Sequence, residues 1–312
     1  TAFIGDVILA TSLIEKLKVT YPQCEIDFLL RKGNESLLDQ HPYIRETLIW
    51  DKKKAKYSSL WVLLKKVQKK NYDYVINLQR FGATGLLTAF SGAKARIGFA
   101  KNPFSFFFTH RFAHILEQGV HEIERNHALI KSLTDELPAK PKLYPTKSDF
   151  DAIAPYLDRP FVTISPASVW FTKQLPVHKW IELVQTLNQN SVVYLLGAAS
   201  DHDYAKEIIS GCPSHDIINV CGKLSLLTSA ALMSKATRNY VNDSAPLHLA
   251  SAMNAPVTAI FCSTVPDFGF GPLSADSKIV ELSEKLSCRP CGLHGKKKCP
   301  EGHFKCAEKI QF

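Results

Sequence analysis

The chain has 312 residues, of which 46% are hydrophobic and 21% are charged, the balance of an ordinary globular protein. At roughly 150 residues per domain, this length predicts two domains, and the composition excludes a disordered, collagen-like or low-complexity chain. The richest aromatic run, residues 104–112, is interrupted by Thr109, His110 and Arg111. No stretch approaches the ~18 apolar residues that a bilayer span needs.

Lys and Arg number 38 against 29 Asp and Glu, which gives a formal charge of +9. This excess favours anionic partners such as phosphorylated metabolites, nucleic acid or an anionic membrane face. The basic residues form short clusters along the chain rather than one tail, and no nucleic-acid recognition motif accompanies them. We therefore expect no nucleic-acid partner.

The eight cysteines are too few for a disulfide scaffold in a chain of this length. Nothing at the start resembles a signal peptide, and the thiol pattern favours a cytoplasmic protein. The chain opens at Thr1 without a Met, so we expect it to begin inside its first strand.

The first half alternates between strand and helix patterns. Residues 2–4 are expected to end a strand, Gly5 and Asp6 to form a tight turn, and residues 8–17 carry apolar side chains at helical spacing. Short apolar runs at 26–30 and 74–78 predict two more strands. This alternation predicts a parallel sheet with crossover helices.

A stretch rich in Pro and Lys at 138–148 predicts a linker, which divides the chain into domains at 1–145 and 146–312. The alternation then resumes, with expected strands at 161–165, 192–196, 240–241 and 257–261 and expected helices at 177–187, 225–233 and 246–253. We predict two doubly wound α/β halves that face each other across a cleft. In such sheets ligands bind beyond the carboxyl ends of the strands.

Asp6 stands at the expected strand-to-helix turn. It could be the N-cap of the helix, a position that Asp favours, or a carboxylate that accepts a proton from a substrate. The residue pattern alone favours the cap, and the two roles are compatible.

Residues 242–248 join a short strand to a helix whose first turn contains small residues and Pro246. Pro suits this turn because its missing N–H would be unpaired there in any case. The open backbone N–H groups of such a turn predict an anion site for phosphate. His248 follows one turn later, where it could also be a packed core residue.

The first strand of the second half is followed by Ser168, Thr172 and Lys173. A lysine among hydroxyl groups predicts a phosphate contact, whereas Trp170 and Trp180 nearby also fit core packing. The next strand ends in a turn of small residues before Asp201 and Asp203. Acidic side chains after such a turn can bind the diol of a ribose, but turns of this composition are common, so the pattern alone is a weak signal.

Four cysteines crowd the C-terminal tail at Cys288, Cys291, Cys299 and Cys306. A C-x2-C pair followed by two thiols suggests a tetrahedral zinc site, although a second close pair is missing. The alternative is a reduced tail that packs against the domain, and we favour it over a metal site.

Five stretches in order resemble glycosyltransferase family 9, the heptosyltransferases of lipopolysaccharide core assembly. They are GDVILATSLIEKLK, SPASVWFTKQLPVHKW, GAASDHD, NDSAPLHLASAMNAPV and CRPCGLHGKKKCPEGHFKC. The tail looks most like the heptosyltransferase II branch. The resemblance implies a GT-B fold, with an acceptor-binding N-terminal half and a nucleotide-sugar-binding C-terminal half.

The activity implied by the resemblance is inverting, metal-independent transfer of L-glycero-D-manno-heptose from ADP-heptose, with no cofactor. Asp6 matches the proposed catalytic base of the family. The expected donor contacts are Ser168, Thr172, Lys173, Asp201, Leu224, Asp243, Ser244, Ala245 and His248. Ala245 stands where the family commonly has Gly, and its usual Glu is absent at the ribose position.

The implied acceptor is a phosphorylated lipid A core that carries Kdo and heptose, with candidate contacts at Arg80, Lys94, Arg96 and Lys101. The same charge could hold the protein at the anionic inner face of the inner membrane. The alternatives are a nucleotide-sugar epimerase, another GT-B enzyme that uses a nucleotide sugar, and a nucleotide-sugar sensor.

Overall fold

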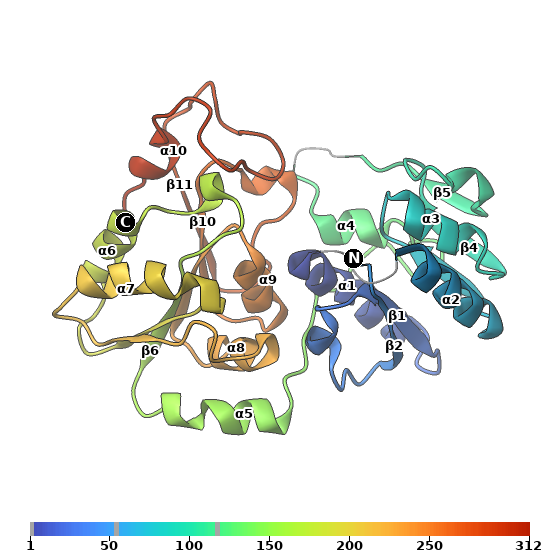
Figure 1. Ribbon diagram of the computed structural model, residues 1–312, viewed down its shortest axis with the longest axis horizontal. Coiled ribbons are helices and arrows are strands. Elements are labelled where there is room, and N and C mark those ends of the chain that lie inside the picture. The colour runs from blue at the N-terminus through green and yellow to red at the C-terminus, as the bar shows by residue number, and fades with distance from the viewer. Residues whose placement is uncertain (1–2, 53–55, 116–118) are drawn as a thin grey trace. The chain divides into compact units, whose positions relative to one another are not determined.

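The computed structural model describes residues 3–52, 56–115 and 119–312. The chain divides into two compact units, Thr1–Pro141 (unit 1) and Lys142–Phe312 (unit 2). Both consist of parallel strands and helices (Figure 1), as the alternating sequence pattern predicts. Among the described residues, no helix is long and apolar enough to cross a membrane.

Unit 2 contains one parallel sheet of six strands in the order β11-β10-β9-β6-β7-β8. The strands are β6 (Phe161–Ser165), β7 (Val192–Leu195), β8 (Ile217–Asn219), β9 (Arg238–Asn242), β10 (Val257–Phe261) and β11 (Ser277–Glu281). The chain builds outward from β6 to β8 and then crosses back to β9. The point between β6 and β9 is therefore the topological switch point, where such sheets bind ligands.

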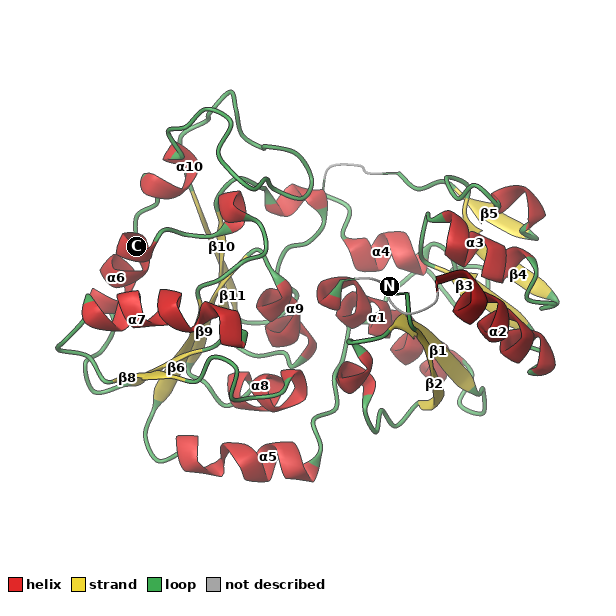
Figure 2. Ribbon diagram, in the orientation of Figure 1, coloured by secondary structure: helices red, strands yellow, loops and turns green. Residues whose placement is uncertain are grey.

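Helices cover both faces of this sheet (Figure 2). The helices of unit 2 are α5 (Lys147–Ile153), α6 (Val177–Gln185), α7 (His202–Ser210), α8 (Leu226–Met233), α9 (Ala245–Ala252) and α10 (Lys305–Glu308). Ser225 caps α8 by accepting the backbone N–H of Thr228 at 3.0 Å, a stabilising arrangement at a helix start.

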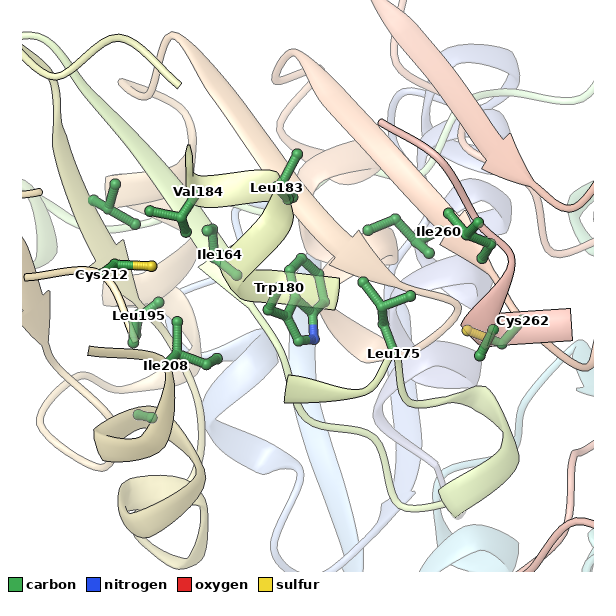
Figure 3. Close-up of a cluster of buried hydrophobic side chains, with 14 of the residues drawn as sticks. Ile164, Leu175, Trp180, Leu183, Val184, Leu195, Ile208, Cys212, Ile260 and Cys262 are labelled. Atoms are coloured by element: carbon green, nitrogen blue, oxygen red, sulfur yellow. The ribbon is translucent and has the colours of Figure 1, made fainter. Parts of the chain in front are cut away.

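The core of unit 2 gathers around Trp180 of α6, which is fully buried between Leu175 and strand residues such as Ile164 (Figure 3). This confirms the core-packing alternative for Trp180. Phe304 and Cys306 of the tail belong to the same cluster. The C-terminal tail is thus part of the folded core.

The strands of unit 1 form two separate parallel sheets, β1-β2 and β3-β4-β5. They are β1 (Ile26–Arg31), β2 (Ile44–Trp50), β3 (Tyr74–Asn77), β4 (Ala95–Phe99) and β5 (His110–Phe112). The helices are α1 (Ile4–Thr20), α2 (Lys56–Lys69), α3 (Gly82–Ala89) and α4 (Glu122–His127).

The start of the chain differs from the sequence-based prediction. Helix α1 begins at Ile4, and its N-cap is Phe3, which makes no side-chain capping bond. The predicted turn at Gly5 and Asp6 is therefore wrong, and Asp6 is the third residue of the helix rather than its N-cap. Ile4 is helical, and the rest of the predicted strand at 2–4 lies partly outside the described residues.

Candidate active site

An ion pair lies at the switch point of unit 2. Lys173 follows β6 and Asp243 follows β9, and Lys173 Nζ lies 2.7 Å from Asp243 Oδ2. Thr264, which follows β10, donates its hydroxyl to the same carboxylate at 2.6 Å. Three chain segments thus meet at the carboxyl edge of neighbouring strands, as the parallel order requires.

Asn242 holds two of these segments together. Its Nδ2 donates to the carbonyl of Pro166 at 2.7 Å, and its Oδ1 accepts the N–H of Leu175 at 3.1 Å. The side chain is fully buried, so these bonds are costly to break. Asn242 therefore sets the position of the loop that carries Lys173, a role that the sequence pattern did not reveal.

Helix α9 starts beside the ion pair. Ser244 is its N-cap without a side-chain capping bond, and Ala245 is its first residue. The first-turn N–H groups of a helix have no partner within the helix and attract anions. His248 is buried in the same helix and its ring lies 6.3 Å from that of Phe270, which fits a packed histidine.

The predicted ribose and adenine contacts follow β7 and β8. Asp201 accepts the N–H of Ala198 at 2.8 Å, so part of its carboxylate already stabilises the turn. The N–H of Gly222 donates to the carbonyl of Gly197 at 2.9 Å, which joins this turn to the one that carries half-buried Leu224. Both residues lie at the same sheet edge as Lys173.

The hydroxyl groups of Ser168 and Thr172, both predicted donor contacts, form hydrogen bonds within unit 2. Ser168 Oγ accepts the N–H of Trp170 at 3.4 Å. Thr172 is fully buried, and its Oγ1 interacts with Ser263 Oγ at 2.9 Å and accepts the N–H of Lys296 at 2.8 Å. Thr172 therefore attaches the Lys173 segment to the C-terminal tail.

The tail thiols are all free. Cys306 is buried, and burial, together with the charge of Cys291, raises its pKa to about 11. Cys288 Sγ lies 4.0 Å from His303 Nε2. Within the described part of the chain, no group of three or more His, Cys, Asp or Glu side chains is arranged to hold a metal ion.

In unit 1, the carboxyl group of the partly buried Asp6 has a raised pKa. Burial and the negative charge of Glu122 raise its pKa to about 6, although Arg80 acts in the opposite direction. Glu122 begins α4, which packs against α1, and is paired with Arg125 at 2.8 Å. A carboxyl group with such a pKa exchanges protons near neutral pH, as a general base does.

Basic residues surround the carboxyl ends of β3, β4 and β5. Arg80 follows β3, Lys101 follows β4, and both are exposed. His114, which follows β5, is buried; burial and the charges of Arg80, Arg125 and Lys101 lower its pKa to about 4. Positive charge therefore gathers on this edge of unit 1.

Two of the predicted acceptor contacts lie elsewhere. Lys94 precedes β4 and pairs with Asp73 at 2.7 Å, so it lies at the amino end of the strands. Arg96 donates to the backbone carbonyls of Ala93 and Phe107 and so supports a loop. The structure brings Arg80 and Lys101 to one edge but separates Lys94 from them.

Unit 2 is a doubly wound α/β sheet with a charged pair and a helix N-terminus at its switch point, the place where such sheets bind their ligands. The model of glycosyltransferase family 9 (heptosyltransferase) matches residues 60–304. The chain belongs to this family and is a glycosyltransferase.

Two relatives and one solved structure agree with this family assignment. Lipopolysaccharide heptosyltransferase 3 of Escherichia coli K12 is 28% identical over 83% of this chain and 80% of its own length. Lipooligosaccharide heptosyltransferase 2 of Haemophilus influenzae is 23% identical over 91% and 87%. The structure of E. coli ADP-heptose lps heptosyltransferase II has a TM-score of 0.78 and 22% identity, with 93% of each chain covered. This likeness confirms the expected GT-B fold.

Proposed function

We propose that this glycosyltransferase moves heptose from ADP-heptose to the inner core of lipopolysaccharide, with inversion at the anomeric carbon and without a metal ion. Lipopolysaccharide or lipooligosaccharide appears in the names of its relatives, which supports lipopolysaccharide as the class of acceptor. The name of the solved heptosyltransferase II includes ADP-heptose, which supports the donor. Family membership favours transfer over the epimerase and sensor alternatives.

The diphosphate of the donor binds at the switch point of unit 2. Lys173 has three N–H donors, and Asp243 accepts one of them. The others are available to phosphate oxygens, as are the N–H groups that begin α9. Together they stabilise the negative charge that develops on ADP as it leaves.

The observation that carries the mechanism is the acidity of Asp6, whose pKa of about 6 leaves it ionised at neutral pH yet basic enough to take a proton. In the reaction, an acceptor hydroxyl oxygen attacks the anomeric carbon of heptose. The bond from this carbon to the ADP oxygen breaks with its electron pair. The hydroxyl proton goes to the Asp6 carboxylate.

The acceptor, a phosphorylated lipid A core bearing Kdo and heptose, binds to the basic edge of unit 1 near the exposed Arg80 and Lys101. The excess of nine positive charges over the chain also supports peripheral binding to the anionic cytoplasmic face of the inner membrane, at about 1 kcal/mol per basic residue near the surface. Such binding to anionic vesicles weakens as salt is added. Salt-insensitive binding would argue against it.

The testing experiment incubates the protein with ADP-heptose and a heptosylated Kdo–lipid A acceptor, with and without EDTA. We expect release of ADP that requires the acceptor, is unaffected by EDTA, and yields a product of inverted anomeric configuration by NMR. Donor turnover without acceptor would point to another reaction. Retention of configuration would exclude Asp6 as the base of a single displacement, and inhibition by EDTA would exclude a metal-independent reaction.

A further inference from the structure

Unit 1 exposes a group of aromatic side chains that the proposed catalytic steps do not use. Phe90, which directly follows α3, is 45% exposed. Phe106 and Phe107, in the 3-10 turn Ser105–Phe107, are 81% and 50% exposed. The ring centroids of Phe90 and Phe107 lie 5.6 Å apart, and those of Phe106 and Phe107 lie 5.7 Å apart. The three rings therefore form one apolar cluster, unlike single exposed side chains, which are common on any surface.

Helix α2 extends this cluster. It contacts α3, beside which it lies in Figures 1 and 2, and its Gln68 Nε2 donates to the carbonyl of Phe90 at 2.8 Å. Trp61, Lys65 and Gln68 are spaced by four and three residues, so they share one face of the helix. Trp61 is exposed, and Lys65 Nζ lies 5.2 Å from the centroid of its ring. The aromatic patch thus consists of Trp61, Phe90, Phe106 and Phe107.

The loop that carries the two most exposed rings is fixed on both sides. Asn102, which precedes the turn Ser105–Phe107, is buried, and its Nδ2 donates to the carbonyls of Gln79 and Phe81 at 3.0 and 3.1 Å. Phe108, which follows the turn, is buried as well. Because both ends are anchored, the fold itself directs these rings outward.

Positive charge borders the aromatic patch. Arg96 Nε donates to the last carbonyl of the turn at 3.1 Å. Lys65 and Lys69 are exposed one helical turn apart, and neither forms an ion pair among the described residues, whereas Lys66 is paired with Glu46. An apolar surface with such a rim attracts an anionic partner. It disfavours a second copy of the same surface, since a two-fold interface would bring like charges together.

We infer that the aromatic patch is the surface through which this protein docks on an anionic lipid bilayer. Phe106 and Phe107 enter the boundary between headgroups and acyl chains, where aromatic side chains are favoured. The lysines of α2 remain at the level of the anionic headgroups. This inference rests on the proposed membrane binding and deepens it, because it assigns that binding to one surface and adds an apolar contribution.

The aromatic patch is continuous with the proposed acceptor site. The two carbonyls that Asn102 binds belong to Gln79 and Phe81, the neighbours of Arg80 in the chain. Lys101 directly precedes Asn102, and the exposed turn begins three residues after it. A bilayer in contact with the turn therefore lies close to the basic edge that would bind the head of a lipid-linked acceptor.

The test measures co-sedimentation with vesicles of phosphatidylethanolamine and phosphatidylglycerol, without donor or acceptor. We expect Phe106→Ser to weaken partitioning about tenfold, as removal of a large apolar side chain from apolar surroundings does. Its melting temperature should not change, because Phe106 is mostly exposed. Leu137→Ser is the matched control and should bind as the parent does. Leu137 is 73% exposed in the same unit, but it lies near Asp135, which pairs with Lys16 of α1.

A second measurement reports on insertion. The tryptophan fluorescence of Phe106→Trp should be quenched by lipids brominated in their acyl chains more strongly than that of the parent. Leu137→Trp should show no additional quenching. Equal vesicle binding by Phe106→Ser and the parent would overturn the inference, and so would absence of additional quenching in Phe106→Trp.

Self-association is the remaining outcome to measure. A dimer in sedimentation velocity that Phe106→Ser dissociates would overturn the inference, because a second copy would then cover the aromatic patch. Vesicle binding is measured without substrates, so binding that depends on Phe106 supports the docking surface even in a protein that transfers no heptose. Heptose transfer by a protein whose vesicle binding is independent of Phe106 would leave the proposed function in place and refute the docking surface.

Discussion

Lys173 Nζ and Asp243 Oδ2 lie 2.7 Å apart, with side-chain exposures of 14% and 7%. The lysine is thus held by a counter-charge, and Thr264 orients that carboxylate. If the donor binds as proposed, its phosphate meets a cation whose position is already set. Such preorganisation lowers the entropic cost of binding.

Replacement of Lys173 tests its role in the donor site. We expect Lys173→Met to weaken ADP binding by about 1.5–3 kcal/mol, the range for a hydrogen bond to a charged group, or roughly ten- to hundredfold in Kd. Calorimetric titration with ADP measures this. Lys179→Met is a matched control, because Lys179 is a buried lysine of the same unit that pairs instead with Glu182. Equal affinities for the two variants would remove Lys173 from the donor site.

Loss of Asp243 leaves the lysine without its counter-charge. We expect Asp243→Asn to lower the free energy of unfolding by about 1–3 kcal/mol, measured by urea denaturation. Asp216→Asn breaks an exposed pair with Arg159 and should cost less than about 1 kcal/mol. If both variants lose the same stability, burial does not strengthen the Lys173–Asp243 pair.

Asp6→Asn should have opposite effects on catalytic activity and on the stability of the fold. Asp6 has a pKa of about 6 in the folded protein, against 3.8 for an unperturbed aspartate. The folded state therefore holds the proton more tightly, and stability falls as pH rises from about 4 to about 6. At pH 7.5 the variant should be more stable by at most about 3 kcal/mol, from two pKa units at 1.36 kcal/mol each, and inactive. Thermal denaturation and turnover assays measure both.

The activity itself should rise with pH through about 6 if Asp6 acts as the base, since only the ionised form accepts a proton. Substantial activity in Asp6→Asn would disprove the mechanism. Normal ADP affinity in an inactive, folded variant would support it.

Glu122→Gln removes a negative charge that raises the pKa of Asp6. We expect the acidic limb of the kcat/KM profile to move to lower pH, measured from pH 4.5 to 8. Glu136→Gln is the control, because this exposed carboxylate pairs with Lys131 and is not among the groups that affect Asp6. An unmoved profile in Glu122→Gln would mean that Asp6 does not control the limb.

The C-terminal tail packs against Lys173 at Gly295. Its φ is +75°, and a Cβ there would lie 2.8 Å from Lys173 Cγ. Gly292 has a φ of +101° with no atom within 4 Å of such a Cβ. Both Ala variants should lose stability through backbone strain, but only Gly295→Ala should also weaken ADP binding. Equal ADP affinities would show that the tail does not position Lys173.

Local patterns determined much of this fold. Continuous apolar runs predicted β6 and β10 with their observed bounds, and Ser225 marked the start of α8. Small residues with Pro246 marked the start of α9. These signals lie within a few residues of each other, because helix caps and buried strands depend on neighbours along the chain.

The sequence alone also revealed the family resemblance. From this resemblance it predicted Asp6 as the catalytic base and Lys173 and Asp243 as donor contacts. It misplaced the start of α1, since Gly5 and Asp6 suggest a turn while packing against α4 favours helix from Ile4.

Only the tertiary structure decided that Lys173 pairs with Asp243, that Lys94 and Arg80 lie at opposite ends of their strands, and that Glu122 acts on Asp6. The physical reason is that strand order and helix packing bring together side chains far apart in the chain, and no local pattern specifies that order.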